Sequence, residues 1–177
     1  MTVYYIQRGV GLVELLVVVV ILAILATIAV PSFVEINDRY RVKAVADTTS
    51  SILHLARSEA VVSNVPVFVS VTSGNNSCIG ARRNGTCDCN LVDASAADYC
   101  TFKLINTPEL KGVQVSAAAF GANSYTVFDP VRGTASSGAI ALVSANGRNL
   151  SVNLSALGRV KMCSPAGSGR LTEYPVC

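Results

Sequence analysis

The order of apolar and polar positions divides the chain into a long helical part and a remainder with a shorter period. Between residues 10 and 30 the only charged side chain is Glu14. A run this long and apolar predicts a helix that is buried on all sides, with the length that crosses about 30 Å of hydrocarbon. Pro31 follows, and it is expected to kink or loosen the helix because it removes one backbone hydrogen bond.

Beyond Pro31 the pattern becomes amphipathic and predicts that residues 32–62 continue the helix along a globular domain. Asn64 and Pro66 then end it, so we expect one helix from about residue 10 to about residue 62. The apolar positions of this second half recur at mixed spacings of three and four: Phe33, Ile36, Tyr40, Val45, Ile52, Leu55 and Ala56.

Residues 63–177 are rich in short alternating segments separated by turn signals, which predicts β-structure. Residues 73–100 form a long excursion that carries cysteines. The expected strands are 65–72, 101–105, 113–117, 124–128, 139–143, 150–154 and 159–163. The fold class is therefore α+β, with one N-terminal helix packed on antiparallel sheets.

Charge and cysteines disagree about the side of the membrane on which this domain lies. The net charge is +3, and Arg8 precedes the apolar run whereas Arg39, Arg41 and Lys43 follow it. The positive-inside rule would thus favour a cytoplasmic domain. All six cysteines, however, lie beyond residue 77, which suits an oxidising compartment such as the periplasm. We favour the periplasm, because the short leader contains too few charged residues for the positive-inside rule to be decisive.

Glu14 and the junction before it indicate processing and helix assembly. A carboxylate within hydrocarbon costs at least about 2.5 kcal/mol, so it points to a partner, although a glutamate at the membrane edge is the alternative. An ordinary signal peptide is cut after its apolar core, whereas the junction Gly9-Val10 precedes it. With Glu14 five residues into the mature chain and Pro31 seventeen further on, the N-terminus resembles the class III signal of type IV pilins and pseudopilins. Val10 and Gly11 depart from the usual Phe and Thr.

This resemblance implies a prepilin with a leader over residues 1–9 and a transmembrane and assembly helix over residues 10–31. A prepilin peptidase would cut after Gly9 and N-methylate Val10. The chain would then cross the bacterial inner membrane once, with its domain in the periplasm, before assembly into a surface pilus. Its partners would be an inner-membrane assembly platform and other major and minor pilins. Glu14 would pair with the α-amine of a neighbouring Val10, and Pro31 would mark where the helix bends or melts.

The domain resembles the GspH/FimT/FimU branch of minor pilins and minor pseudopilins. The supporting residues are 128–133 (Phe-Asp-Pro-Val-Arg-Gly) and 158–163 (Gly-Arg-Val-Lys-Met-Cys), where Lys161 stands in place of the branch's second Arg. The resemblance implies a minor type IV pilin that helps to prime assembly or occupies the tip. Two alternatives are a minor pseudopilin of type II secretion and a tip subunit that binds double-stranded DNA during transformation.

Arg159 and Lys161 lie two apart on an expected strand, so both should project from one face. We consider a phosphate-binding patch, and we weigh it against a solvated or subunit-facing strand, which we prefer. The candidate residues for the patch are Gly158, Arg159, Lys161, Arg148, Arg132 and Arg170.

The cysteines are interpreted as disulfides. Cys163 and Cys177 would close a C-terminal loop, as the pilin resemblance implies. Cys78, Cys87, Cys89 and Cys100 would pair either as 78–87 with 89–100 or as 78–89 with 87–100. A zinc site is the competing interpretation, but the spacing lacks the usual two-residue knuckle, so we expect no metal.

We expect no enzyme activity and no cofactor. His54 is the only histidine, and it lies in the helix far in sequence from any candidate nucleophile. Phosphate-binding loops, metal triads and paired catalytic carboxylates are not found in the sequence.

Overall fold

The computed structural model describes residues 11–102 and 104–177, apart from the side chains of residues 28–32, 104, 107 and 108. The chain forms two compact units, Met1–Asn37 and Asp38–Cys177. Helix α1 (Leu12–Ser63) contributes its first half to the first unit and its second half to the second. Its bounds agree with the helix expected from the sequence, and the helix continues through Pro31.

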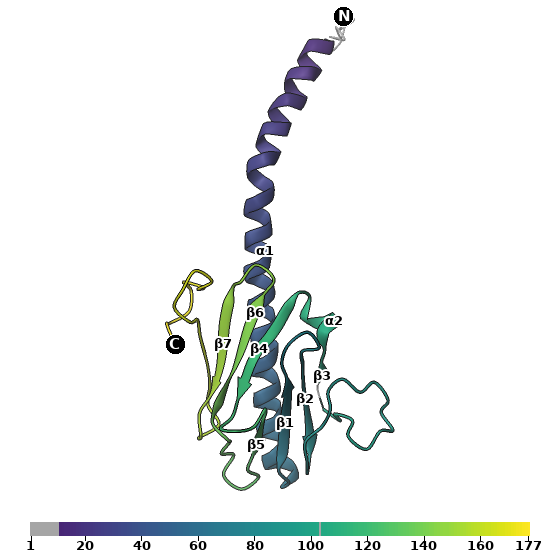
Figure 1. Cartoon of the computed structure of the whole chain (residues 1–177), viewed down its shortest axis with the longest axis vertical. Helices are drawn as coiled ribbons and strands as arrows, with labels where there is room; N and C mark the ends of the chain where they lie inside the picture. Colours follow the sequence, from purple (N-terminus) through teal and green to yellow (C-terminus); the bar gives the residue numbers. More distant parts are fainter. Residues whose placement is uncertain (1–10, 103) are drawn as a thin grey trace, which may run out of the picture. The chain divides into compact units, whose positions relative to one another are not determined.

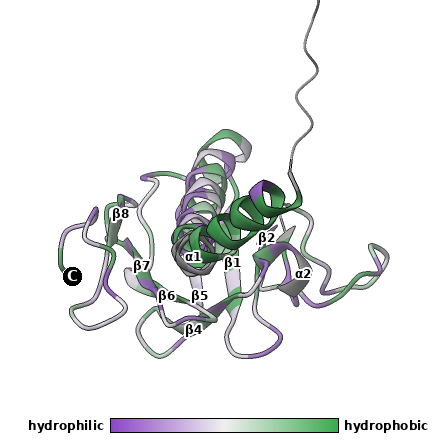
Figure 2. Ribbon diagram, turned by 90° about the horizontal axis from the view of Figure 1, so that it is seen from above, coloured by the Kyte–Doolittle hydropathy of each residue, from purple (hydrophilic) through white to green (hydrophobic). Residues whose placement is uncertain are grey.

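The first unit is the hydrophobic half of α1, shown mostly in green in Figure 2. Its described side chains are exposed in the single chain. Within the described part of the chain, no helix combines the length and the apolarity needed to cross a membrane.

In the second unit, one stripe of α1 is buried. Its members recur every three or four residues, which is the period of a helix with one apolar face; they are Val42, Val45, Ala46, Thr49, Ile52, Leu53, Ala56 and Ala60. Four of the seven expected apolar positions are exposed instead: Tyr40 at 67% and Leu55 at 46% in this unit, and Phe33 and Ile36 in the first unit. At 100° per residue Tyr40 and Leu55 fall well away from the centre of the buried stripe.

Helix α1 ends at the residues that the sequence indicated. Asn64 adopts a left-handed φ of 52° directly after Ser63, and Pro66 follows. Asparagine is one of the residues that tolerate this conformation at a helix C-terminus, and proline cannot continue the helix.

Two antiparallel four-stranded sheets make up the rest of the second unit. One has the order β3-β2-β1-β5 and the other β4-β6-β7-β8. The first sheet contains β1 (Val67–Thr72), β2 (Cys78–Arg83), β3 (Leu104–Ile105) and β5 (Tyr125–Phe128). The second contains β4 (Val113–Ala119), β6 (Gly138–Ser144), β7 (Asn149–Leu154) and β8 (Val160–Cys163), and a short helix α2 (Thr107–Leu110) precedes β4.

The expected strands are confirmed except within the cysteine-bearing part of the chain. Strand β2 was missed, because its sequence Cys-Ile-Gly-Ala-Arg-Arg does not alternate between apolar and polar residues. It pairs with β1 in register from Val67 opposite Arg83 to Thr72 opposite Cys78. Of the strand expected over residues 101–105, the structure shows β3 at Leu104–Ile105, and Thr101 and Phe102 lie outside it.

The core of the second unit lies between α1 and both sheets. Figure 1 shows the two sheets on the same side of the second half of α1. Phe128 from β5, Ile79 from β2 and Ile140 from β6 are fully buried beside Ile52 and Leu53 of the helix. Figure 2 places β8 and the C-terminus at one side of this unit, and α2 with the excursion at the other.

Candidate functional site

The predicted processing and assembly residues lie at the start of α1. Gly9 and Val10 fall outside the described residues, so their role stays a prediction. Glu14 is exposed in the first turn, where its backbone N–H donates to the carbonyl oxygen of Gly11 at 3.0 Å. A carboxylate in the first turn of a helix is stabilised by the helix dipole.

Around and beyond Glu14, α1 presents apolar side chains to its surroundings. Leu12 is 82% exposed, Val18 is 49% exposed, and Phe33 is 72% exposed. Fully covering one such side chain is worth about 1.5–3 kcal/mol, so this half of the helix requires a cover that a single chain does not supply. We call this surface, formed by the exposed apolar residues between 12 and 36, the helix surface.

The structure brings together only part of the predicted basic patch. Arg159 and Lys161 are both exposed and line one open groove of about 390 Å³ beside Met162, Pro175 and Val176. Lys161 lies opposite Asn153 of β7 in the sheet register. The expectation that these two cations share one surface is thus met.

The other cations lie elsewhere. Arg170 bridges to Asn149 at the start of β7, four residues before Asn153, which is about 13 Å along a strand. Arg148 lies in the β6–β7 turn, where its N–H donates to Ser144 Oγ at 3.0 Å. Arg132 is exposed on the loop after β5. The structure therefore does not bring Arg170, Arg148 and Arg132 together with Arg159 and Lys161, because they lie near the other end of β7 and on a separate loop, and anion binding by these residues stays a prediction.

Gly158 has a packing role rather than a place in the basic patch. It is buried with φ +72°, and a Cβ there would lie 2.6 Å from the carbonyl oxygen of Gly133 and 3.0 Å from Arg57 Nε. Arg57 Nε–H in turn donates to that same Gly133 oxygen at 3.0 Å. Gly133 and Gly158, one from each family-like segment, thus both lie against Arg57 of α1. Sequence reasoning missed Arg57, which carries no signal except its charge on a half-buried helix position.

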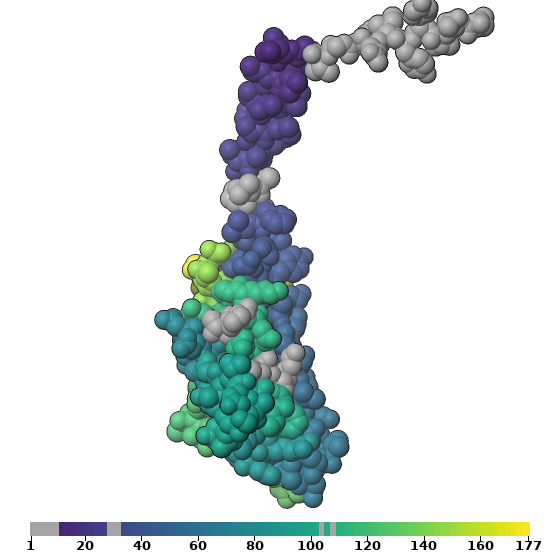
Figure 3. Space-filling model, turned by 90° about the vertical axis from the view of Figure 1, so that its right-hand side faces the viewer, coloured from purple at the N-terminus to yellow at the C-terminus, as the bar shows by residue number. Residues whose placement is uncertain are grey.

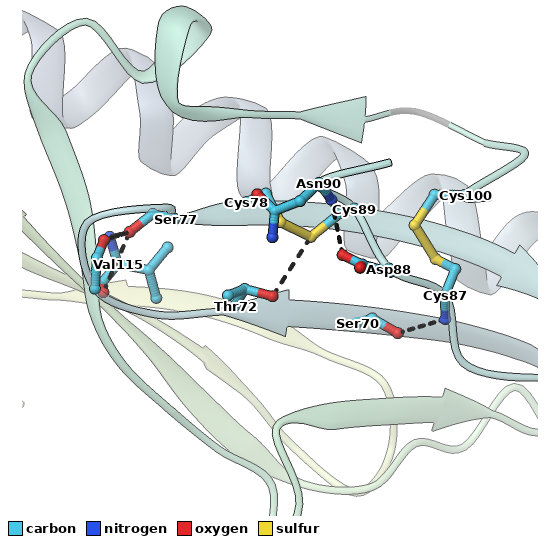
Figure 4. The surroundings of a disulfide bond; sticks show 11 residues. Ser70, Thr72, Ser77, Cys78, Cys87, Asp88, Cys89, Asn90, Cys100 and Val115 are labelled. Atoms are coloured by element: carbon cyan, nitrogen blue, oxygen red, sulfur yellow. Dashed lines mark hydrogen bonds between the residues drawn. A yellow bond between two sulfur atoms is a disulfide. The ribbon is translucent and has the colours of Figure 1, made fainter. Parts of the chain in front are cut away.

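The cysteines form three disulfides, Cys78–Cys89, Cys87–Cys100 and Cys163–Cys177. The first two correspond to the second of the alternatives left open by the sequence. Figure 4 shows them beside β1 and β2, where Ser70 Oγ accepts a hydrogen bond from the Cys87 N–H at 3.0 Å. In Figure 3 the part of the excursion that follows β2, in teal, faces the viewer. The Cys78–Cys89 bond therefore fastens the excursion to β2, and the Cys87–Cys100 bond closes a loop within the excursion.

The C-terminal loop is organised around Ser164, which is fully buried. Its hydroxyl donates to the Asn149 carbonyl oxygen at 2.7 Å and accepts from the Leu171 N–H at 2.9 Å. Burial raises the pKa of Tyr174 in this loop, against a lowering contribution from nearby Lys43. The neutral phenol is favoured, so its contribution to stability is complete below the tyrosine's ordinary pKa of about 10 and is lost above it.

We expect Cys163→Ser with Cys177→Ser to lower the free energy of unfolding by about 3 kcal/mol, because the bridge closes a loop of this length in the unfolded chain. Urea unfolding of the oxidised wild type and of the double variant measures the difference. Reductant should lower the unfolding midpoint of the wild type by more than that of the variant, because only the wild type has the C-terminal disulfide to lose. Equal unfolding midpoints for the two oxidised proteins would contradict the prediction.

The fold defines the class of protein as pilin-like: an N-terminal helix packed on antiparallel sheets. The chain belongs to the family of the type II transport protein GspH, whose model matches residues 45–158. Residues 6–30 match the prokaryotic N-terminal methylation motif, which includes Gly9, Val10 and Glu14. This is a family of structural pilins and pseudopilins, and the resemblance to its GspH/FimT/FimU branch is confirmed.

The structure is also similar to the crystal structure of the type IV minor pilin FimU from Pseudomonas aeruginosa PAO1. The TM-score is 0.50 at 14% sequence identity, and the match covers 77% of this chain and 97% of that chain. At this identity the likeness shows the fold alone. No curated protein matches the sequence.

Proposed function

We propose that the chain is a minor pilin that is cut after Gly9 and inserts its helix among the helices of other pilins to help prime a type IV pilus or occupy its tip. The observation that carries this proposal is the helix surface, which a single chain leaves exposed. A membrane would cover it before assembly, and neighbouring helices would cover it afterwards. Between residues 12 and 30, Glu14 is the only charged residue of this helix, and it would give the stack a preferred register.

A minor pseudopilin of type II secretion is the alternative within the same fold. The printed name of the matching family supports a role in secretion, and the likeness to FimU supports the pilin fold. The proposal and the alternative therefore differ only in the machine that the subunit serves. Isolation of sheared surface pili, with quantification of this chain by mass spectrometry, distinguishes them. A low ratio to the major pilin supports the proposal, and absence from pili with presence in the secretion complex supports the alternative.

DNA binding is a second candidate function, supported by the shared groove of Arg159 and Lys161. Contact through two cations predicts that the logarithm of affinity falls with the logarithm of salt concentration with a slope of only about −2. A titration of double-stranded DNA at several salt concentrations, with the full-length chain in detergent micelles, measures that slope. No binding at low salt removes this candidate.

The helix contact itself is testable by photo-crosslinking. We expect p-benzoylphenylalanine in place of Val18 to crosslink the chain to other pilins in the sheared filament fraction. The same group in place of Val92 is a matched control, because Val92 is 88% exposed and Val18 only 49%. Crosslinking that simply follows exposure would favour position 92. Crosslinks from position 18 to lipid only, in every fraction, would contradict the proposal.

A further inference from the structure

Strand β8 lies at the edge of its sheet, and its side facing away from β7 is only partly occupied. The sheet order is β4-β6-β7-β8, so β7 is the only strand of this sheet beside it. On the far side, the C-terminal tail makes a single parallel bridge between Ser164 and Val176. The Ser164 N–H donates to the Pro175 carbonyl oxygen at 2.9 Å.

The register shows which backbone groups point toward that open side. The Ser155 N–H donates to the Arg159 carbonyl oxygen at 2.9 Å, and Lys161 faces Asn153 two residues further along. Hydrogen-bonded and non-bonded pairs alternate along an antiparallel ladder. The N–H and C=O groups of Val160 and Met162 therefore point away from β7. Within the described residues, neither pair of groups has a backbone partner on that side.

This open stretch of β8 lies directly beside the groove. Met162, Pro175 and Val176 supply apolar lining, and Arg159 and Lys161 place two cations on it. The side chains of Val160 and Met162 pack on the core, so the cations occupy the opposite face of the strand. The edge offers backbone donors and acceptors in alternation, and one face beside it is positively charged.

These features select among ligands. A phosphate backbone supplies acceptors only, so it leaves the carbonyl groups of Val160 and Met162 unpaired. An extended polypeptide supplies donors and acceptors at the spacing of the edge. Cross-strand neighbours on one face of a sheet interact directly, and opposite charges there are favourable. Carboxylates two residues apart on an incoming strand would thus meet Arg159 and Lys161.

We propose that the open edge of β8 binds an extended segment of another protein chain by strand addition. That segment carries acidic side chains at alternate positions, with an apolar residue between them. The acidic side chains face Arg159 and Lys161, and the apolar one faces the side of Val160 and Met162. This interaction goes beyond helix-mediated assembly and does not depend on it.

The test uses the full-length chain in detergent micelles and a short blocked peptide that alternates glutamate and valine. We expect this peptide to bind and to slow hydrogen exchange at the amides of Val160 and Met162. A lysine–valine peptide of the same length should not bind. Arg159→Glu with Lys161→Glu should weaken binding of the acidic peptide roughly thirtyfold, since two attractive cross-strand pairs become repulsive.

Two further variants separate strand addition from simple charge attraction. Lys111→Glu with Arg132→Glu makes the same change in net charge at exposed positions outside the groove, and binding should be retained. Val160→Pro removes an outward N–H without removing a bond to β7, and binding should fall by more than in Val160→Ala, which also loses the core packing of the valine but keeps the N–H.

Three results would overturn the proposal. One is failure of the acidic peptide to bind, and another is equal binding to the Arg159→Glu, Lys161→Glu double variant. The third is binding of a double-stranded DNA probe that displaces the peptide while the Val160 and Met162 amides exchange at their free rate throughout, which would assign the cations to phosphate.

Discussion

Glu14→Leu is expected to reduce incorporation of the chain into filaments on the order of a hundredfold. In the proposed assembly the carboxylate pairs with the α-amine of a neighbouring subunit among apolar helices. Removing one partner of a buried pair leaves the other charge unpaired, at a cost of about 3–5 kcal/mol. The same substitution makes the helix more apolar, so membrane insertion should be kept or improved. Quantitative immunoblots of sheared filaments and of membranes measure the two effects separately.

The control for this variant is Val13→Leu, because it alters the neighbouring exposed residue without touching the charge. Its incorporation should equal that of the wild type. Glu14→Gln removes the charge but keeps a polar side chain, and its incorporation into filaments should be reduced nearly as much as that of Glu14→Leu. Normal filament levels of Glu14→Leu would show that the carboxylate only lies at the membrane edge, as the alternative interpretation of the sequence has it.

Much of the fold could be predicted because local chemistry and tertiary structure agree there. The end of α1 illustrates this, since Asn64 takes the left-handed conformation and Pro66 blocks continuation, as their positions in the sequence indicated. The strands of the second sheet could also be located, because one face of each is buried and the sequence alternates accordingly. β6, for example, buries Ile140, Leu142 and Ser144 in alternation.

The remainder depended on contacts that no local pattern encodes. Strand β2 is buried on both faces for most of its length, under disulfides as well as against the core, so its residues do not alternate. The pairing Cys78–Cys89 with Cys87–Cys100 depends on how the excursion folds back over β1 and β2, which spacing alone leaves open. The relative positions of the basic residues could be predicted only for Arg159 and Lys161, which lie two residues apart at the start of β8. The separation of Arg170 from Lys161 is set by the path of the C-terminal loop.

The sequence makes residues of the family-like segments candidates for anion binding, although a solvated or subunit-facing strand is preferred, and the structure places these residues in different surroundings. Arg159 and Lys161 are exposed, whereas Gly158 is buried between Gly133 and Arg57. A motif can therefore combine a glycine that allows elements to approach with cations that face outward. Only mutation of the two kinds of residue separately will distinguish stability from binding.

Gly158→Ala is expected to lower the free energy of unfolding by about 4 kcal/mol. Part of this, about 1–2 kcal/mol, is the cost of a left-handed conformation for a residue with a Cβ, since φ is +72°. The rest is overpacking, because the new methyl group would lie 2.6 Å from the Gly133 carbonyl oxygen, a backbone atom held by Arg57. Chemical denaturation of the full-length chain in micelles, followed by circular dichroism, measures the loss.

Gly147→Ala is the matched control for this substitution. Its φ of +78° imposes a similar conformational cost, but nothing lies within 4 Å of the added Cβ. It should therefore lose only about 1–2 kcal/mol, and the difference between the two variants isolates the steric term. Equal losses would mean that the contact of Gly158 with Gly133 and Arg57 relaxes freely. In that case the left-handed backbone conformation alone, and not the close approach to the helix, would explain why position 158 is a glycine.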